Sequence, residues 1–159
     1  MLLIVLAFGW WQARDQDTSS DRVPAGGSST VEVDRVVDGD TAKVFYEGDS
    51  EYVRYIGIDT PESVKPGTEV QCFGKESTAF NAEAIEGKRV KLVFDQEKRD
   101  RYDRLLAYVY VDGRLLNAEI LRRGYGTTLE ISPNTSKASQ FRDLEDEARA
   151  ADRGLWSAC

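Results

Sequence analysis

Short runs of β-branched and aromatic residues, separated by turn signals, place the strongest constraint on how this chain can fold. Three such runs follow one another at 31–37, 41–46 and 52–58, and the sequences DGD and EGD lie between them. Two more runs lie at 88–94 and 105–111. Runs of this length bounded by Asp and Gly predict strands joined by tight turns. The first three are therefore expected to form a consecutive antiparallel meander.

Three other segments are typical of helices, because helix-forming residues recur at helical spacing and a glycine lies just beyond each segment. They are 75–86, 115–123 and 136–152. The first interrupts the series of strands, and the other two follow the last strand. Five short strands with helices at these positions predict a small closed barrel of the oligonucleotide/oligosaccharide-binding (OB) type. The expected fold class is α+β, a five-stranded OB-fold barrel with three α-helices.

The length of 159 residues suits one domain, which we expect to occupy residues 31–159. Residues 12–30 are mostly polar and small, and they predict a flexible linker. Within residues 1–11 lies an apolar run of ten residues, shorter than the roughly 20 that a membrane-spanning helix needs. We interpret residues 1–11 as the remnant of a signal or a membrane anchor, and a misplaced start codon is a third interpretation.

The chain contains no histidine, and this excludes serine–histidine triads, histidine general bases and histidine metal sites. Any hydrolytic chemistry must therefore use carboxylates, Arg, Lys, Tyr or a metal ion.

Two cysteines, Cys72 and Cys159, are too few for a four-thiolate zinc site. One interpretation is a disulfide that closes a long loop and stabilises the fold by roughly 4 kcal/mol. The other is a pair of unrelated thiols. A disulfide would indicate an oxidising compartment. Together with the apolar N-terminal run it favours a secreted or extracytoplasmic location, and a membrane tether through the N-terminus is left open.

Acidic residues gather where two of the predicted strands end. Asp38 and Asp40 follow the first run, and Asp59 and Glu62 follow the third. Clustered carboxylates raise one another's pKa unless a cation neutralises them, so their convergence would indicate a bound metal ion. Oxygen ligands favour a hard cation, and Ca²⁺ accepts less regular geometry than Mg²⁺. The alternative is that these acids are solvated turn residues.

Two arginines accompany the acids. Arg54 lies inside the third run with the same parity as Ile56 and Ile58, so its side chain is expected to start from a partly buried face. A buried guanidinium needs an anionic partner. Arg104 precedes the last run within the charged stretch KRDRYDR, where a solvated loop is the plain interpretation of Lys98.

The segments VVDGDTAKV, VRYIGIDTPES and DRYDRLLAYVYVDGRLLNAEIL, in this order and spacing, resemble the staphylococcal nuclease (thermonuclease) family over about residues 31–156. The resemblance implies an OB-fold nuclease that depends on Ca²⁺. Such an enzyme hydrolyses phosphodiester bonds of single-stranded DNA and RNA and leaves 3′-phosphate products. Whether cleavage is endo or exo is not decided by the motifs.

The resemblance also implies a role for each acidic motif residue. Asp40, Asp59 and the backbone carbonyl of Thr60 would bind Ca²⁺ directly. Glu62 would approach the ion through water and accept or orient the proton of the attacking water. Asp38 would lie behind the direct ligands. These residues form the expected metal site.

For the substrate, the resemblance implies that Arg54 and Arg104 grip the scissile phosphate, because the guanidinium fork matches phosphate oxygens. Arg54, Glu62 and Arg104 are thus the expected catalytic residues. Tyr102 matches the family tyrosine before the second arginine, and Tyr102 and Lys98 are expected to contact substrate.

One segment departs from the family pattern. The family often places tyrosines just before the Pro-Asn of its last loop, where they contact the terminal phosphate and the base. Here Leu129, Glu130 and Ile131 occupy that region, and Tyr125 is the nearest candidate to compensate. Weaker binding of a substrate's terminal phosphate, or a different preference between exo and endo cleavage, is therefore expected.

The net charge of −7 weighs against a polyanionic ligand, because affinity for nucleic acid rests largely on Lys and Arg. Residues 88–123, however, contain ten Lys or Arg against six Asp or Glu, so a basic face on an acidic body is expected. The alternatives to an enzyme are a non-catalytic OB-fold module that binds nucleic acid or protein, and a calcium-stabilised structural domain. We expect a monomer that acts on single-stranded DNA or RNA and has no stable protein partner.

Overall fold

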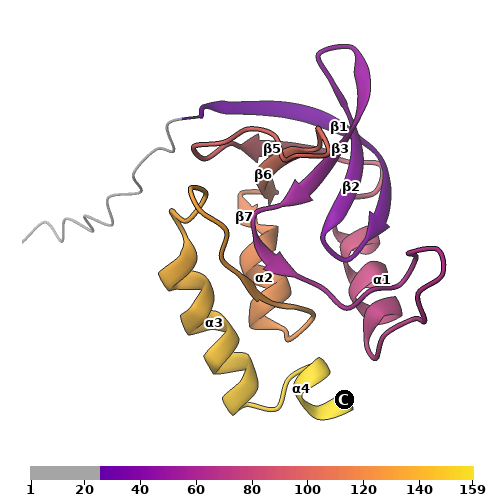
Figure 1. Cartoon of the computed structure of the whole chain (residues 1–159), viewed down its shortest axis with the longest axis vertical. Coiled ribbons are helices and arrows are strands. Elements are labelled where there is room, and N and C mark those ends of the chain that lie inside the picture. Colours follow the sequence, from indigo (N-terminus) through magenta and orange to yellow (C-terminus); the bar gives the residue numbers. More distant parts are fainter. Residues whose placement is uncertain (1–25) are drawn as a thin grey trace, which may run out of the picture.

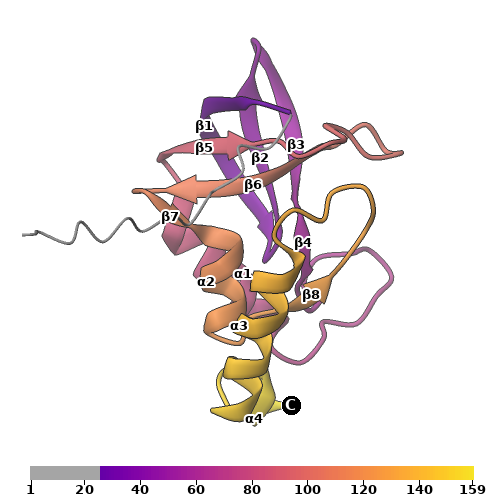
Figure 2. The ribbon, with the colours of Figure 1, turned by 90° about the vertical axis from the view of Figure 1, so that its left-hand side faces the viewer.

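The predicted meander opens the fold. The computed structural model describes residues 26–159. Strands β1 (Ser28–Asp38), β2 (Thr41–Tyr46) and β3 (Asp49–Tyr55) pair antiparallel in that order, as the DGD and EGD turns predict. The β2–β3 hairpin projects beyond the other strands (Figures 1 and 2).

A pairing between distant strands closes the barrel. β5 (Arg89–Val93) lies beside β1, and β6 (Leu105–Val111) lies beside β5. β6 then pairs in parallel with β3, and the short β7 (Arg114–Leu115) extends the sheet past β6. The five strands β1, β2, β3, β5 and β6 thus form a closed barrel, and this confirms the predicted OB fold.

The third predicted strand is in fact two strands. β3 ends at Tyr55, and β4 (Gly57–Asp59) leaves the barrel to pair with β8 (Thr127–Leu129), which the sequence did not predict. Gly57 lies at the bend with φ +79°, and a Cβ atom there would come within 2.6 Å of the Phe141 ring. A single strand over 52–58 was therefore wrong, because this bend requires a glycine.

The three predicted helices are present; the first is shifted by one residue, and the other two are slightly shorter than predicted. They are α1 (Gly74–Ile85), α2 (Leu116–Arg122) and α3 (Ala138–Ala150), and a single unpredicted turn, α4 (Leu155–Ala158), follows them. Figures 1 and 2 show the helices together at one end of the barrel. β4 and β8 lie beside them, so the chain that leaves β3 runs from the barrel towards the helices.

Barrel and helices share one hydrophobic core. On β3, Val53 and Tyr55 point inwards with 0% and 2% exposure, whereas Tyr52 is 41% exposed. This alternation is the period expected of a strand with one buried face. Phe141 of α3 packs edge-on against Tyr108 of β6, at a ring distance of 6.0 Å. The core thus connects α3 directly to the barrel wall.

Cys72 and Cys159 form a disulfide in the structure, with their Cα atoms 5.9 Å apart. It ties the C-terminal residue to the loop that follows β4. Residues 1–11 and most of residues 12–30 lie outside the described part of the chain, so the expected linker and signal or anchor stay predictions, as does the domain boundary at residue 31. Among residues 26–159, no helix combines the length and apolar character needed to cross a membrane.

Candidate active site

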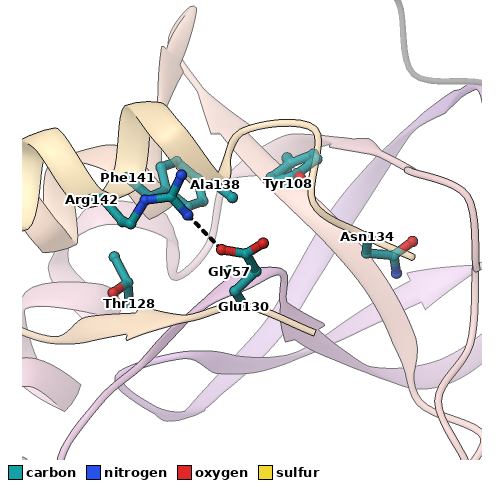
Figure 3. Close-up of a pocket in the computed structure, with 8 residues that line it drawn as sticks. All are labelled: Gly57, Tyr108, Thr128, Glu130, Asn134, Ala138, Phe141 and Arg142. Carbon is teal, nitrogen blue, oxygen red and sulfur yellow. Dashed lines mark hydrogen bonds and ion pairs between the residues drawn. The ribbon is translucent and has the colours of Figure 1, made fainter. Parts of the chain in front are cut away.

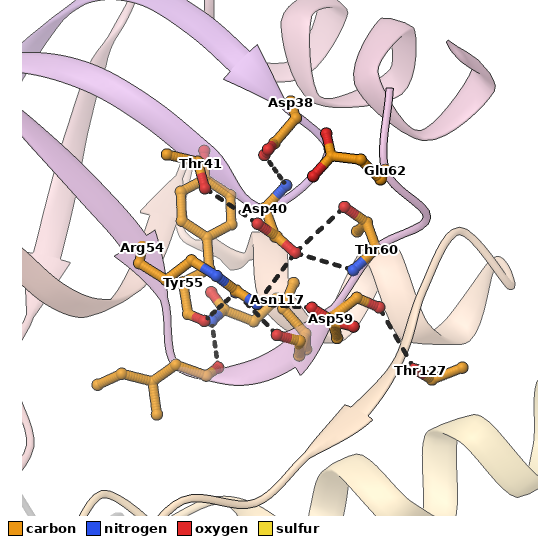
Figure 4. A network of polar contacts seen from close by, with 12 residues as sticks. Asp38, Asp40, Thr41, Arg54, Tyr55, Asp59, Thr60, Glu62, Asn117 and Thr127 are labelled. Atoms are coloured by element: carbon orange, nitrogen blue, oxygen red, sulfur yellow. Dashed lines mark hydrogen bonds and ion pairs between the residues drawn. The ribbon is translucent and has the colours of Figure 1, made fainter. Parts of the chain in front are cut away.

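The acids of the two motifs meet where β2 begins and β4 ends (Figure 4). Asp38 is the last residue of β1, and Asp40 directly precedes β2. Asp59 is the last residue of β4, and Thr60 follows it. A Cβ atom at Gly39 would lie 2.6 Å from the Thr60 hydroxyl, so glycine permits this close approach. The structure therefore brings the two acidic motifs together as predicted from the sequence.

Asp40 is the buried centre of the cluster, with 4% exposure. Its Oδ2 atom accepts hydrogen bonds from the backbone N–H of Thr60 at 2.8 Å and from the Thr60 hydroxyl at 3.2 Å. Its Oδ1 atom accepts one from the hydroxyl of Thr41 at 3.0 Å. Because a buried carboxylate is costly without such partners, these bonds fix both its position and its orientation.

Arg54 contacts both carboxylates among the predicted metal ligands, Asp40 and Asp59. Its Nη2 atom donates to Asp59 at 2.8 Å and lies 3.2 Å from Asp40, and its Nη1 atom donates to the carbonyls of Tyr55 and Ile58. The side chain is only 14% exposed, as expected. The shared parity with Ile56 and Ile58 is not the reason for this burial, because β3 ends at Tyr55. Arg54 points out of the barrel, and the bend after Tyr55 folds the chain back over the guanidinium.

Two buried amides hold this bend in place. Asn117 of α2 donates to the carbonyl of Ile56 at 2.8 Å and accepts from the backbone N–H of Val109. Asn81 of α1 donates to the carbonyl of Asp38 at 2.7 Å and accepts from the hydroxyl of Tyr55. Sequence reasoning missed both residues, since a single polar residue in a helix does not reveal that it faces the interior.

The cluster holds more negative charge than Arg54 neutralises. Burial and the nearby charge of Asp40 raise the pKa of Asp38 to about 6. Burial also raises the pKa of Asp59, despite the opposing effect of Arg54, and the charges of Asp40 and Glu62 add to the rise. A cation bound here would relieve this repulsion.

The donor set fits a hard cation. Asp40, Asp59 and the carbonyl of Thr60 offer oxygen atoms only, which suits Ca²⁺ with water completing its coordination. Within residues 26–159, no three acidic or thiol side chains converge closely enough to hold a metal ion by themselves. A bound ion would thus depend on two carboxylates, one carbonyl and water.

Glu62 lies in the loop between β4 and α1, where its own backbone orients it. Its Oε1 atom accepts three backbone N–H groups, from Ser63 at 3.0 Å and from Val64 and Lys65 at 2.9 Å. These bonds, that from Val64 foremost, hold the pKa of Glu62 below its usual value. The Oε2 atom makes no hydrogen bond to any described residue, so it is the oxygen open to water or substrate.

A second residue of that loop fastens Glu62. The side-chain carbonyl of Gln71 accepts the N–H of Glu62 at 2.7 Å, and the N–H of Gln71 donates to the carbonyl of Glu62 at 2.8 Å. Cys72 follows directly and is bonded to Cys159. The sequence offered no signal for Gln71, because its partner lies nine residues away across an irregular loop.

The two predicted phosphate-binding arginines line one cleft of about 480 Å³. Arg104 enters it from the loop before β6, where its Nε atom donates to Asp100 at 2.7 Å. Although burial pushes the pKa of Asp100 upwards, hydrogen bonds from Arg104 and from the Tyr102 backbone hold it below the usual value. The Arg104 guanidinium also lies 5.5 Å from the centre of the Tyr102 ring. An anion in this cleft would meet both guanidinium groups.

The cleft rim bears the apolar residues noted in the sequence. Leu129 and Ile131 are 38% and 62% exposed, and they line the cleft opposite Tyr102, which is 64% exposed. Tyr125 does not compensate for the missing tyrosines, because its ring is stacked between Phe73 and Phe80.

Lys98 lies apart from this cleft. Its Nζ atom bonds the hydroxyl of Tyr46 and lies 4.8 Å from the centre of the Phe94 ring. It is not among the residues that line the cleft. A contact between Lys98 and substrate stays a prediction, and it would require a substrate long enough to extend beyond the cleft.

A smaller cavity of about 50 Å³ shares Gly57 and Asn134 with the cleft (Figure 3). Arg142 and Glu130, which form an ion pair of 2.5 Å, also line it. Its size leaves room for little more than water. Arg54 and Arg104 line the larger cleft and not this cavity.

The comparisons with known proteins agree with this geometry. The sequence model of the family described as "Staphylococcal nuclease homologue" matches residues 52–158. Over 129 residues, 80% of this chain, it is 43% identical to SPbeta prophage-derived endonuclease YokF and 42% identical to Endonuclease YncB, both of Bacillus subtilis (strain 168). The matches span 44% and 61% of those two proteins. The thermonuclease of Staphylococcus hyicus is 35% identical over 128 residues, which cover 80% of this chain and 76% of that protein.

Proposed function

The chain belongs to the family of staphylococcal nuclease homologues, and from this premise we propose that it is a calcium-dependent nuclease. Its substrates would be single-stranded DNA and RNA, and its products would carry a 3′-phosphate. The relatives are a thermonuclease and two endonucleases, and this similarity supports nuclease activity in general. The finer statements on metal, substrate and product rest on the motifs.

One observation supports this proposal most strongly. Arg54 of β3 and Arg104 of the loop before β6 line the same cleft, and Arg54 also bonds Asp59 and lies beside Asp40. Arg54 therefore contacts the carboxylates of the expected metal site and also lines the cleft where a phosphate would bind. A binding module would gain nothing from acids placed beside the arginines that grip its phosphates.

In this proposal the two arginines bind and orient the phosphate. Their guanidinium groups donate to the non-bridging oxygens and stabilise the charge that grows there in the transition state. Asp100 positions Arg104 through the Nε bond, which leaves the Nη atoms of that arginine free of this contact. The Arg104 guanidinium also lies over the Tyr102 ring, which supports its position in the cleft wall.

The carboxylates complete the site. Asp40, Asp59 and the Thr60 carbonyl would hold Ca²⁺, whose chemistry when bound is to neutralise phosphoryl charge and to make a nearby water more acidic. Oε2 of Glu62 accepts or orients the proton of the attacking water. The backbone hydrogen bonds that lower the pKa of Glu62 favour its carboxylate form, which can accept a hydrogen bond from the attacking water and so orient it. Water adds to phosphorus, the bond from phosphorus to the 5′-oxygen breaks, and that oxygen leaves with a proton.

The experiment that tests this proposal measures cleavage of heat-denatured DNA and of RNA by the full chain, with Ca²⁺ and then with a chelator. Arg104→Ala should lower the rate by roughly 100- to 1000-fold, as loss of a donor to transition-state charge does. Arg89→Ala is the matched control, because Arg89 is exposed on β5 and does not line the cleft. Digestion that is unaffected by the chelator would overturn the calcium requirement.

The same assay separates an enzyme from the non-catalytic alternatives. Glu62→Gln should abolish most turnover while Ca²⁺ and oligonucleotides still bind. A chain that binds single strands but digests none, with or without Glu62, would instead be a binding module.

We further propose that the protein works outside the cytoplasm. The disulfide between Cys72 and Cys159 supports this location, because such bonds persist in oxidising compartments. Fractionation of expressing cells, with thiol titration of the recovered protein, tests it. Protein found only in the cytoplasm with both thiols free would overturn it.

A further inference from the structure

The outer face of the β1–β3 meander carries a row of residues that the catalytic proposal does not use. The strand register places Arg35 of β1 opposite Lys43 of β2, and Lys43 opposite Tyr52 of β3. Arg35 is exposed, Lys43 is half-buried, and Tyr52 is 41% exposed. Two cations and an aromatic ring thus lie side by side across three neighbouring strands.

This row adjoins the candidate active site. Tyr52 and Arg54 are two residues apart on β3, so their side chains leave the same face about 7 Å from each other. The next row of the sheet pairs Arg54 with Thr41, and Thr41 with Asp38. Tyr52 itself does not line the cleft. The row is therefore a continuation of the site along the outer barrel surface.

The charges around the row define what it can accept. Within residues 26–159, neither Arg35 nor Lys43 forms an ion pair with a carboxylate, and the Lys43 ammonium lies 5.1 Å from the centre of the Tyr52 ring. Glu51, the neighbour of Tyr52, is already paired with Arg99 at 2.9 Å. Both cations are available to phosphate, and an exposed aromatic ring suits a base.

Acidic residues limit the row on its far side. Glu47 and Asp49 lie at the turn of the β2–β3 hairpin, and Glu32 of β1 lies opposite Phe45 of β2. A polyanion would be repelled beyond this line. Asp34 occupies the bulge next to Arg35, where the register shifts. The favourable surface is therefore short, and it has room for about one nucleotide beyond the cleft.

We propose that Tyr52, Lys43 and Arg35 form a stacking subsite for one base of a single-stranded nucleic acid whose neighbouring phosphate lies between Arg54 and Arg104. This inference rests on the proposed function for the identity of the ligand. Tyr52 stacks on the base, and Lys43 and Arg35 contact the phosphate that follows. Stacking of a base on an aromatic side chain tolerates any sequence, so the subsite adds affinity without base preference.

The test compares binding of fluorescein-labelled oligothymidylate with binding of an abasic strand of equal length, by fluorescence anisotropy in the presence of a chelator. The full chain should prefer oligothymidylate, and Tyr52→Ala should weaken its binding by roughly 5- to 100-fold while leaving the abasic strand unchanged. Tyr52→Trp should restore the preference. Lys43→Ala should weaken both ligands, and Lys91→Ala, on the outer face of β5, should weaken neither.

Equal affinities of Tyr52→Ala and the unchanged chain for oligothymidylate would overturn the subsite, provided that both melt at the same temperature. Cleavage by the same proteins in Ca²⁺ keeps this outcome apart from failure of the proposed function. If the unchanged chain digests DNA and Tyr52→Ala has no effect on KM, the subsite is overturned and the nuclease proposal stands. If the chain digests nothing but Tyr52→Ala still weakens the binding of oligothymidylate, the subsite stands and the proposed catalysis is overturned.

Discussion

The guanidinium of Arg54 lies 2.8 Å from the carboxylate of Asp59, and the two side chains are brought together by the bend at Gly57. The same guanidinium lies 3.2 Å from the buried carboxylate of Asp40. One arginine thus stabilises the site and faces the cleft where a phosphate would bind. Stability and function are therefore linked at this residue.

Arg54→Ala should destabilise the fold by about 3 kcal/mol, because it leaves the buried Asp40 without its counter-charge. Urea unfolding measures this loss. Arg142→Ala is the control, since Arg142 and Glu130 form an ion pair that is more than half exposed and is worth about 1 kcal/mol or less. Ca²⁺ should restore part of the stability lost in Arg54→Ala. Similar small losses in both variants would contradict the central place given to Arg54.

Gln71→Ala should lower kcat by roughly 10- to 100-fold with little change in KM, because Glu62 loses the side-chain acceptor that holds its backbone in place. Glu69→Ala, an exposed change in the same loop, should behave like the unchanged chain. Gln71→Glu keeps an acceptor and should recover most of the activity. Steady-state kinetics with denatured DNA decides between these outcomes, and a purely structural role would move the melting temperature alone.

Reduction of the bond between Cys72 and Cys159 should lower the free energy of unfolding by roughly 4 kcal/mol, since the bond closes a loop of 87 residues. The chain with both cysteines changed to serine should match the reduced protein and be insensitive to reductant. Urea denaturation with and without dithiothreitol measures both. Identical stabilities of the oxidised and reduced chains would mean that the bond constrains nothing.

Acid should remove part of the stability through Glu51. Hydrogen bonds from Arg99 lower the pKa of Glu51 in the folded state. Its contribution is therefore fully present above the unfolded value near 4.3 and is lost as pH falls through the lower folded value. The stability difference between the unchanged chain and Glu51→Gln should shrink below about pH 4. The same comparison in an Arg99→Ala background should show no such trend, because the hydrogen bonds that lower the pKa of Glu51 are then absent.

A 5′-phosphate on an oligonucleotide should confer little or no gain in cleavage, because Leu129 and Ile131 offer the cleft rim no hydrogen-bond donor from their side chains. Matched phosphorylated and unphosphorylated oligonucleotides test this by their kcat/KM values. Ile131→Tyr, which adds a hydroxyl at an exposed position, should create a preference for the phosphate. A strong preference in the unchanged chain would contradict the prediction.

Much of the fold was accessible from the sequence because its signals are local. The bounds of β2 and β6 agree with the runs at 41–46 and 105–111, and the three helices lie where periodicity and a following glycine predict them. Alternation of buried and exposed residues within a strand is a property of a few neighbouring residues. The split of the third run was missed, because it depends on the Phe141 ring, more than eighty residues further along the chain.

For the candidate site, too, the sequence identified some residues and missed others. The order and spacing of the motifs identified the acids and the arginines, and the structure places Asp38, Asp40, Asp59 and Arg54 together. Their roles in catalysis stay predictions. Asn81, Asn117 and Gln71 were missed, because each acts through a hydrogen bond to a distant backbone group that only the folded chain brings near.

The sequence by itself determined most of the strands and helices, the family and the chemical groups available for catalysis, because each of these is carried by short stretches of residues. Only the tertiary structure decided which groups meet. It placed Arg54 against two carboxylates, stacked Tyr125 on Phe80, and placed Tyr52 in the row next to that of Arg54. The physical reason is that burial, hydrogen bonding and charge act through space between residues that the chain keeps far apart in sequence.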